Sequence, residues 1–193
     1  MLFFLVFAIG LLNKVADKVS DDGLVLKTYL RHSIGPVYGL LIALTIAVYP
    51  ILAPLCMAVV ISCIITGKID SKVHLMGIGT FFFFLYILGM PRIDLPIFAA
   101  FFCAGIIDEV GDHYADKGRL KGMMRSFFNH RRTIDVMAIG VSIFTGDLTY
   151  IFAAIVYDFG YTYIFRIKDW IIDSRLAANP AAASRVVRKH RGG

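Results

Sequence analysis

Long apolar segments alternate with short polar connections along most of the chain. The apolar segments cover residues 1–19, 34–66, 74–90, 95–107 with a short extension, and 133–165. A membrane-spanning helix needs about 20 residues, each rising 1.5 Å. The segments 34–66 and 133–165 are too long for one untilted span, and turn-forming pairs interrupt them at Tyr49-Pro50 and Gly146-Asp147. We therefore expect each to form a helical hairpin, which gives about seven helices in all.

The composition supports a chain surrounded by lipid. Of its 193 residues, 58% are hydrophobic and 18% are charged, and the mean hydropathy is +0.73. A soluble domain carries about a quarter charged residues. We expect an all-α integral membrane protein with one transmembrane domain over residues 1–176. Residues 177–193 form a basic tail, which we expect to lie on the cytoplasmic side near anionic lipid headgroups.

The distribution of basic residues sets the expected orientation. If both hairpins are split, every Lys and Arg except Arg92 falls on one side of the membrane. The positive-inside rule makes that side the cytoplasm, with the N-terminus outside and the C-terminus inside. The first helix has no basic leader, so we expect it to be a span and not a cleaved signal. Topology and lipid headgroups explain the net charge of +6, so we expect no nucleic-acid partner.

Two stretches, residues 10–23 and 105–118, match without gaps. The identical pairs are Gly10/Gly105, Val15/Val110, Asp17/Asp112, Asp21/Asp116 and Gly23/Gly118, and Asn13/Asp108 is a near match. Each stretch follows an apolar helix and precedes a basic segment and a hairpin. We infer a duplication with halves at about 1–66 and 96–165. A linking helix at about 74–90 keeps both halves in one orientation, which is a parallel 3+1+3 repeat.

The matching stretches place acidic side chains four residues apart. Asp17 and Asp21 form the first set, and Asp108, Asp112 and Asp116 form the second. On a helix such residues share a face, where like charges repel. A divalent cation between the two sets would offset that repulsion, and Mg²⁺ prefers carboxylate oxygens shared with substrate phosphates. The alternative is that each set is an ordinary solvated helix end. The presence of two equivalent sets on the same side of the membrane favours the metal site over this alternative.

These residues resemble the UbiA superfamily of intramembrane prenyltransferases, which carries two Asp-rich motifs at the cytoplasmic ends of helices. Asn13, Asp17 and Asp21 are similar to the first motif, and Asp108-Glu-Val-Gly-Asp112 is similar to the second. Lys14 stands where the family has its first aspartate. The resemblance covers about residues 1–165.

The resemblance implies Mg²⁺-dependent transfer of a prenyl group from a polyprenyl diphosphate to a lipid or aromatic acceptor. It implies that carboxylates hold the metal, namely Asp17, Asp21, Asp108 and Asp112, with Asp116 as a further ligand. The diphosphate would be bound by Asn13, Lys14, Arg31 and Lys117. The expected partners are therefore membrane lipids and a polyprenyl diphosphate.

Two further residues have alternative roles. His113 either positions diphosphate or acceptor, or is a solvated interfacial residue. Asp158 binds an acceptor hydroxyl, pairs with a cation, or is solvated at the end of its helix. Two other functions remain open: a seven-helix transporter with duplicated halves, and a non-catalytic protein that binds isoprenoid lipid.

Overall fold

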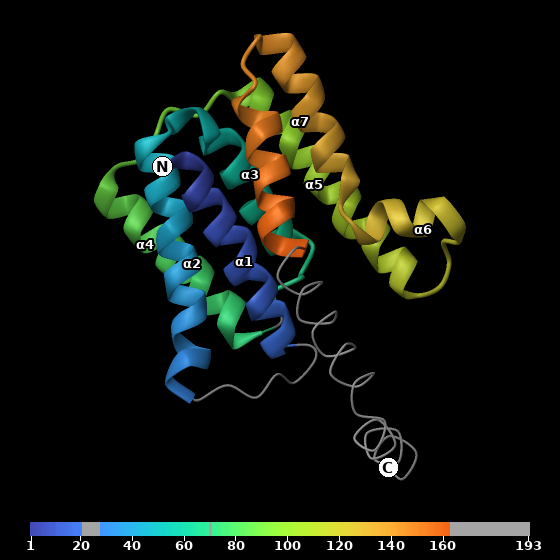
Figure 1. Cartoon of the computed structure of the whole chain (residues 1–193), viewed down its shortest axis with the longest axis horizontal. Helices are drawn as coiled ribbons and strands as arrows, with labels where there is room; N and C mark the ends of the chain where they lie inside the picture. The colour runs from blue at the N-terminus through green and yellow to red at the C-terminus, as the bar shows by residue number, and fades with distance from the viewer. Residues whose placement is uncertain (21–27, 70, 163–193) are drawn as a thin grey trace, which may run out of the picture. The chain divides into compact units, whose positions relative to one another are not determined.

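The structure is a computed structural model that describes residues 1–20, 28–69 and 71–162 (Figure 1). All regular secondary structure in these residues is helical, which confirms the expected all-α class. The helices are α1 (Leu2–Ser20), α2 (Thr28–Val48), the 3₁₀ helix η1 (Pro50–Leu52), α3 (Ala53–Ile65), α4 (Lys72–Leu88), α5 (Leu95–Asp116), α6 (Gly122–Asn129) and α7 (Arg132–Thr145). A last helix occupies 149–162. The predicted tail, 177–193, lies outside the described residues.

Wherever it is described, every apolar segment expected to be helical forms helix, apart from Met1, the two breaks and the last residues of the segments 34–66 and 74–90. Both predicted hairpin breaks are confirmed as breaks. The chain bends by 117° between α2 and α3, where Pro50 cannot continue the hydrogen bonding of the helix before it. Helix α7 ends at Gly146, whose φ of 72° suits glycine. Asp147 accepts a hydrogen bond from the Thr149 amide at 2.8 Å, which begins the last helix.

The short helix α6 is an element that the sequence pattern did not predict. It lies in the polar connection between α5 and α7, in the stretch that follows Lys117. Two glycines with positive φ lead into it: Gly118 turns the preceding chain, and Gly122 is the first residue of α6. Phe128 packs against Gly111 of α5, where a larger residue would collide with the ring.

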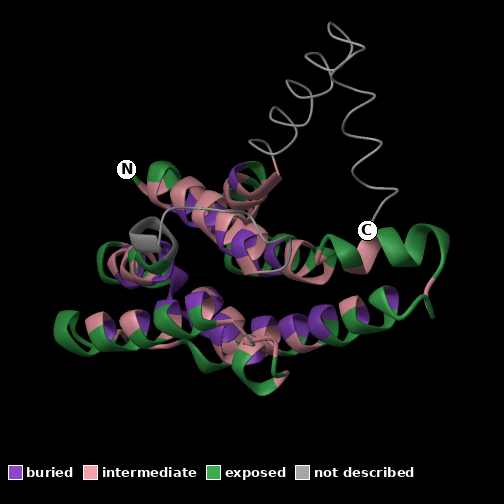
Figure 2. Ribbon diagram, turned by 90° about the horizontal axis from the view of Figure 1, so that it is seen from below, coloured by how far each residue is buried: buried purple, intermediate pink, exposed green. Residues whose placement is uncertain are grey.

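Three groups of buried apolar residues hold Met1–Tyr161 together as one compact unit. One includes Leu52, Phe101 and Tyr150 and joins α1, α3, α5, α7 and the last helix. A second joins α2, α3 and α4, and a third joins α1, α2 and α4. Buried residues follow the helix faces that are turned towards neighbouring helices (Figure 2).

Glycines allow two pairs of helices to approach closely. A side chain at Gly10 of α1 would collide with the carbonyl of Tyr157, and one at Gly160 would collide with the carbonyl of Phe7. Gly39 meets the backbone of α4 at Gly77 in the same way. Such small-residue contacts bring backbones together where dispersion contacts drive packing. They also bring the polar end of α1 against the last helix.

Large apolar side chains remain exposed on the outer faces of several helices. Examples are Tyr86 at 83%, Ile143 at 78% and Phe144 at 89% exposed. Within the described residues, no helix alone has the length and hydropathy of a membrane span. The bent pair His32–Val48 and Pro50–Ile65 reaches that standard when taken together.

Candidate functional site

The two acidic motifs meet one segment of chain, which runs from the end of α3 into the first turn of α4. Lys68 in this segment donates to Asp112 of α5 at 2.7 Å. His74, in the first turns of α4, places Nε2 3.1 Å from Asp17 of α1. Asp17 and Asp112, which occupy matching positions in the two similar stretches, therefore both contact the segment from Lys68 to His74. The carboxyl ends of α1 and α5 and the start of α4 lie at one end of the helices (Figure 1).

Asp17 is the centre of a hydrogen-bonded chain that we call the Asp17 network. The Tyr161 hydroxyl donates to Asp17 Oδ2 at 2.5 Å, and Lys14 Nζ lies 3.3 Å from that hydroxyl. On the other side, His74 Nδ1 lies 3.1 Å from the Tyr38 hydroxyl. An ionised carboxylate only accepts hydrogen bonds, so Nε2 of His74 donates to Asp17. Four helices thus converge on one carboxylate.

Asn13 and Lys14 extend the Asp17 network along α1. The Asn13 amide donates to the Tyr157 hydroxyl at 2.6 Å. Tyr157 and Tyr161 stack with their ring centroids 6.0 Å apart, and the Lys14 ammonium lies 4.3 Å from the centroid of the Tyr161 ring. This cation–π contact and the hydroxyl contact hold the lysine beside the acidic motif.

A second set of contacts, the Glu109 network, surrounds a buried carboxylate of α5. Glu109 is 3% exposed and lies 3.0 Å from Arg131 and 3.9 Å from Lys68. The Cys63 thiol donates to it at 3.3 Å. Burial on its own would lower the Lys68 pKa, but the hydrogen bond to Asp112 and the charges of Asp112 and Glu109 raise that pKa above its ordinary value. Lys68 is therefore held as a cation between two carboxylates.

Asp108 has a different environment from its neighbour in sequence. It is fully buried, and its two oxygens accept backbone hydrogen bonds from Thr133 at 3.0 Å and Ile134 at 2.9 Å. These amides belong to the first turn of α7, where no intrahelical acceptor is present. Asp108 thus supplies the missing acceptor and a favourable charge at that helix end. Both oxygens are committed to positioning α7.

Arg131 connects the Asp17 and Glu109 networks. It precedes α7 with a φ of 50°, a conformation that few residues other than glycine adopt. Its guanidinium pairs with Glu109 and lies within electrostatic range of Asp17, Tyr157 and Tyr161. Arg131 remains 42% exposed and is therefore open to a ligand from outside the helices.

The remaining predicted site residues lie apart from these networks or outside the description. His113, Asp116 and Lys117 are exposed at the end of α5. Asp158 pairs with Arg132 at 2.8 Å, which corresponds to the cation-pairing alternative. Asp21 lies outside the described residues, and Arg31 lies in α2 with a side chain that is not described.

The sequence reading missed several members of the two networks. Glu109 enters the sequence pattern only as an intervening residue of the second acidic motif. Lys68 and Arg131 enter it only as basic residues that indicate the cytoplasmic side, and His74 and Tyr161 belong to no motif. A buried glutamate requires a cationic partner, so Glu109 next to Asp108 is the residue in the sequence that could have indicated such a pair. Its partner was not apparent, because Arg131 lies 22 residues away along the chain.

The carboxylates at this end of the helices meet some of the requirements of a metal site. In the described part of the chain, no three His, Cys, Asp or Glu side chains lie close enough together to hold a metal ion. Asp17 and Asp112 are 27% and 19% exposed, so each carboxylate is accessible. Oxygen donors of this kind suit Mg²⁺.

Comparisons with protein-family models, with curated proteins and with solved structures found no match to this chain.

Proposed function

We propose that the chain is an integral membrane protein that binds a polyprenyl diphosphate and transfers its prenyl group, with Mg²⁺, to a lipid or aromatic acceptor. One observation carries the proposal. Asp17 from the first motif and Asp112 from the second lie at one end of the helices, with Lys68 and Arg131 beside them. Acidic and basic groups together suit a phosphorylated ligand that arrives with a divalent cation.

The exposed apolar surface supports the membrane placement. Phe83, Tyr86, Ile143, Phe144 and Ile155 lie on α4, α7 and the last helix, and each is more than half exposed. Large apolar side chains exposed on three helices suit contact with lipid or a partner. In the proposed orientation, these surfaces face acyl chains across a parallel 3+1+3 repeat, and the end that carries the two networks faces the cytoplasm.

The proposed reaction breaks the bond between the prenyl carbon and the diphosphate oxygen, and the electron pair stays on the diphosphate. The acceptor then bonds to that carbon and releases a proton. Lys68 and Arg131 would stabilise the charge that develops on the leaving group. Asp17 and Asp112, with Asp21 and Asp116, would hold Mg²⁺, which supplies further positive charge to the diphosphate. Asp108 and Glu109 act as positioning residues for α7 and the two cations.

Thermal unfolding of the detergent-purified protein tests this proposal. A ligand that binds only the folded state raises stability by mass action. We expect geranylgeranyl diphosphate to raise Tm only when Mg²⁺ is present, and the Asp112→Asn variant to lose the increase. Asp94→Asn, exposed at the opposite end of α5 and outside the proposed site, is the matched control. An unchanged Tm for the folded wild-type protein with both additions would contradict the proposal.

A second candidate is a protein that binds an isoprenoid phosphate without catalysis. The observation in its favour is that Asp17 and Asp112 already have partners in the protein, and that Lys14 adds a cation to the first motif. This function predicts a rise in Tm that is independent of Mg²⁺ and is lost in Lys68→Met. The same unfolding series therefore separates the two functions.

A further inference from the structure

Helix α6 is an apolar surface element with little attachment to the rest of the protein. None of its eight residues is buried, and Met123 and Met124 are 84% and 52% exposed. Its packing includes the contact of Phe128 with Gly111. Methionines exposed to this degree on a short helix are unusual in contact with water alone.

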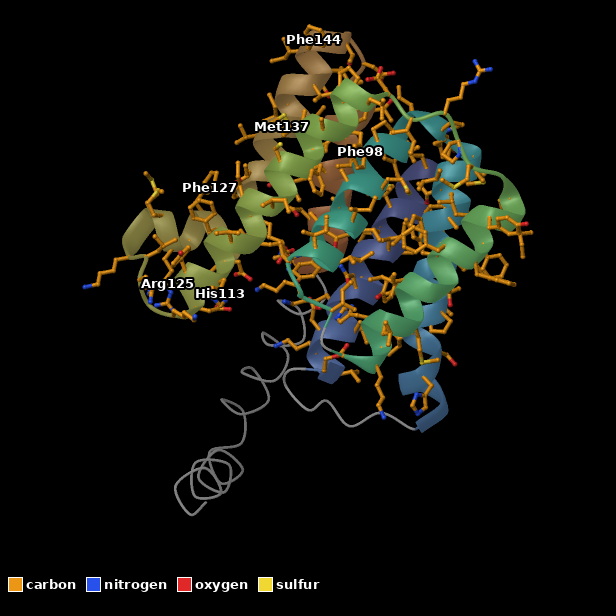
Figure 3. All side chains as sticks on the ribbon, turned by 180° about the vertical axis from the view of Figure 1, so that it is seen from behind. Phe98, His113, Arg125, Phe127, Met137 and Phe144 are labelled. Atoms are coloured by element: carbon orange, nitrogen blue, oxygen red, sulfur yellow. The ribbon has the colours of Figure 1, made fainter. Side chains whose placement is uncertain are left out.

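The two sides of α6 differ in chemistry. Met123, Ser126, Phe127 and His130 recur at helical spacing and, together with Arg132, line a cavity of about 260 Å³. Phe127 lies on the edge of α6 nearer α7, and Arg125 lies on the opposite edge near His113 (Figure 3). Further along α7, Met137 packs towards the core and Phe144 is 89% exposed (Figure 3).

The chain around α6 is uniformly basic. Residues 117–132 contain no Asp or Glu and carry the cations Lys117, Arg119, Lys121, Arg125, Arg131 and Arg132. The first four of these are exposed. An exposed apolar edge flanked by exposed cations is complementary to a surface with phosphate groups above acyl chains.

We propose that α6 lies in the headgroup region of an anionic lipid bilayer. Met123 and Phe127 enter the boundary between headgroups and acyl chains, and Lys117, Arg119 and Lys121 contact lipid phosphates. Charge complementarity selects the bilayer as the occupant of this edge. The inference rests on the membrane placement proposed above and is independent of the proposed reaction.

Tryptophan fluorescence in vesicles tests the location of α6. The chain has one tryptophan, Trp170, and Trp170→Phe provides a silent background for single replacements. In the full-length protein, Met123→Trp reports the apolar edge and Asn129→Trp, one turn after Arg125, reports the polar edge. Phe144→Trp at the end of α7 reports whether the protein is embedded. The vesicles contain phosphatidylglycerol, and their acyl chains are brominated close to the headgroup.

We expect lipid bromine to quench Met123→Trp roughly twofold more than Asn129→Trp, since an interfacial helix buries only one face. Quenching at Phe144→Trp without quenching at Met123→Trp would overturn the inference and leave the membrane placement intact. No quenching at either position would overturn both. A contact between α6 and another protein would give the first of these contrary results, because the tryptophan would be shielded from lipid.

The role of the cations is tested separately with lipid charge. We expect Met123→Trp to be quenched less in phosphatidylcholine vesicles than in phosphatidylglycerol vesicles. The additional replacements Arg119→Gln and Lys121→Gln should produce the same decrease in phosphatidylglycerol vesicles. Equal quenching in both lipids would contradict the proposed attraction to anionic headgroups.

Discussion

The two equivalent aspartates of the repeat, Asp17 and Asp112, have different partners. Asp17 accepts hydrogen bonds from a tyrosine and a histidine, whereas Asp112 is paired with the ammonium group of Lys68. A hydroxyl or imidazole donor can be replaced by a ligand without leaving a bare positive charge, but a lysine cannot. The first carboxylate is therefore the easier one to open to a cation, and the second brings its own cation to the site.

The neighbouring equivalent pair, Asn13 and Asp108, differs in the same direction. Asn13 donates a hydrogen bond to Tyr157, whereas Asp108 accepts two hydrogen bonds from the start of α7. An amide can donate to a hydroxyl, and a carboxylate best satisfies exposed backbone amides at a helix start. The first half thus uses neutral hydrogen bonds where the second half uses charge, and substitutions in the second half should have the larger effects.

Arg131→Met should produce the largest loss of stability. It leaves the buried Glu109 without its closest cation. Breaking a fully buried ion pair costs about 3–5 kcal/mol, and we expect the lower end here because Arg131 is 42% exposed. The measurement is the free energy of unfolding in detergent, with Arg132→Met as the control, because the carboxylate partners of Arg132 are more exposed than Glu109. The double variant Arg131→Met, Glu109→Leu should recover most of the loss. Equal effects of the two single arginine variants would contradict the importance of Glu109.

Asp108→Ala should have the next largest effect. It leaves two amides of α7 without acceptors, which costs about 2–3 kcal/mol at a buried helix start. Asn13→Ala removes one neutral hydrogen bond and should cost about 1 kcal/mol. Unfolding of both variants under identical conditions compares equivalent positions of the repeat. An Asn13→Ala loss as large as that of Asp108→Ala would disprove the proposed difference between the halves.

Tyr161→Phe should have a moderate effect. The hydroxyl joins Lys14 to Asp17, and losing a neutral donor to a half-buried carboxylate costs about 1 kcal/mol. Tyr49→Phe, far from both networks, provides a control for loss of a hydroxyl elsewhere. The measurement is the midpoint of chemical denaturation of each variant, compared between proteins whose unfolding free energy depends equally on denaturant concentration. A Tyr161→Phe protein as stable as the control would show that the Asp17 network contributes little in the absence of ligand.

Arg132→Ala should have the smallest effect. Arg132 pairs with Asp135 at 2.7 Å and with Asp158 at 2.8 Å, but it is 46% exposed. Exposed pairs contribute about 0–1 kcal/mol and weaken in salt. Unfolding at low and high salt should show that even this small loss disappears at high salt. A loss comparable to that of Arg131→Met would indicate that burial of the carboxylate partner does not separate the two arginines.

The sequence predicted the helices better than the contacts between them. Apolar run length and the breaks at Pro50 and Gly146 are local signals, so the helical segments followed from them directly. Helix α6 was missed because its amphipathic pattern covers only eight residues and begins at a glycine. The repeat indicated which helix ends carry the acidic residues.

The partners of those residues depended on packing that the sequence does not show. Asp108 and Asp112 occupy one motif, yet one carboxylate positions α7 and the other pairs with Lys68. Glu109 lies between them on a different face of α5, which turns its side chain into the protein. The Asp17 contact with Tyr161 spans 144 residues, and no local pattern specifies such a distance along the chain.

The most direct test asks whether Asp17 and Asp112 act on the same bound ligand. Asp17→Asn, Asp112→Asn and the double variant form a cycle, and the readout is the rise in Tm with geranylgeranyl diphosphate and Mg²⁺. Residues that share one ligand are coupled, so the double variant should lose little more of this rise than either single variant. Each single variant should lose most of it. Independent, additive losses, or a normal rise in either single variant, would contradict a shared site.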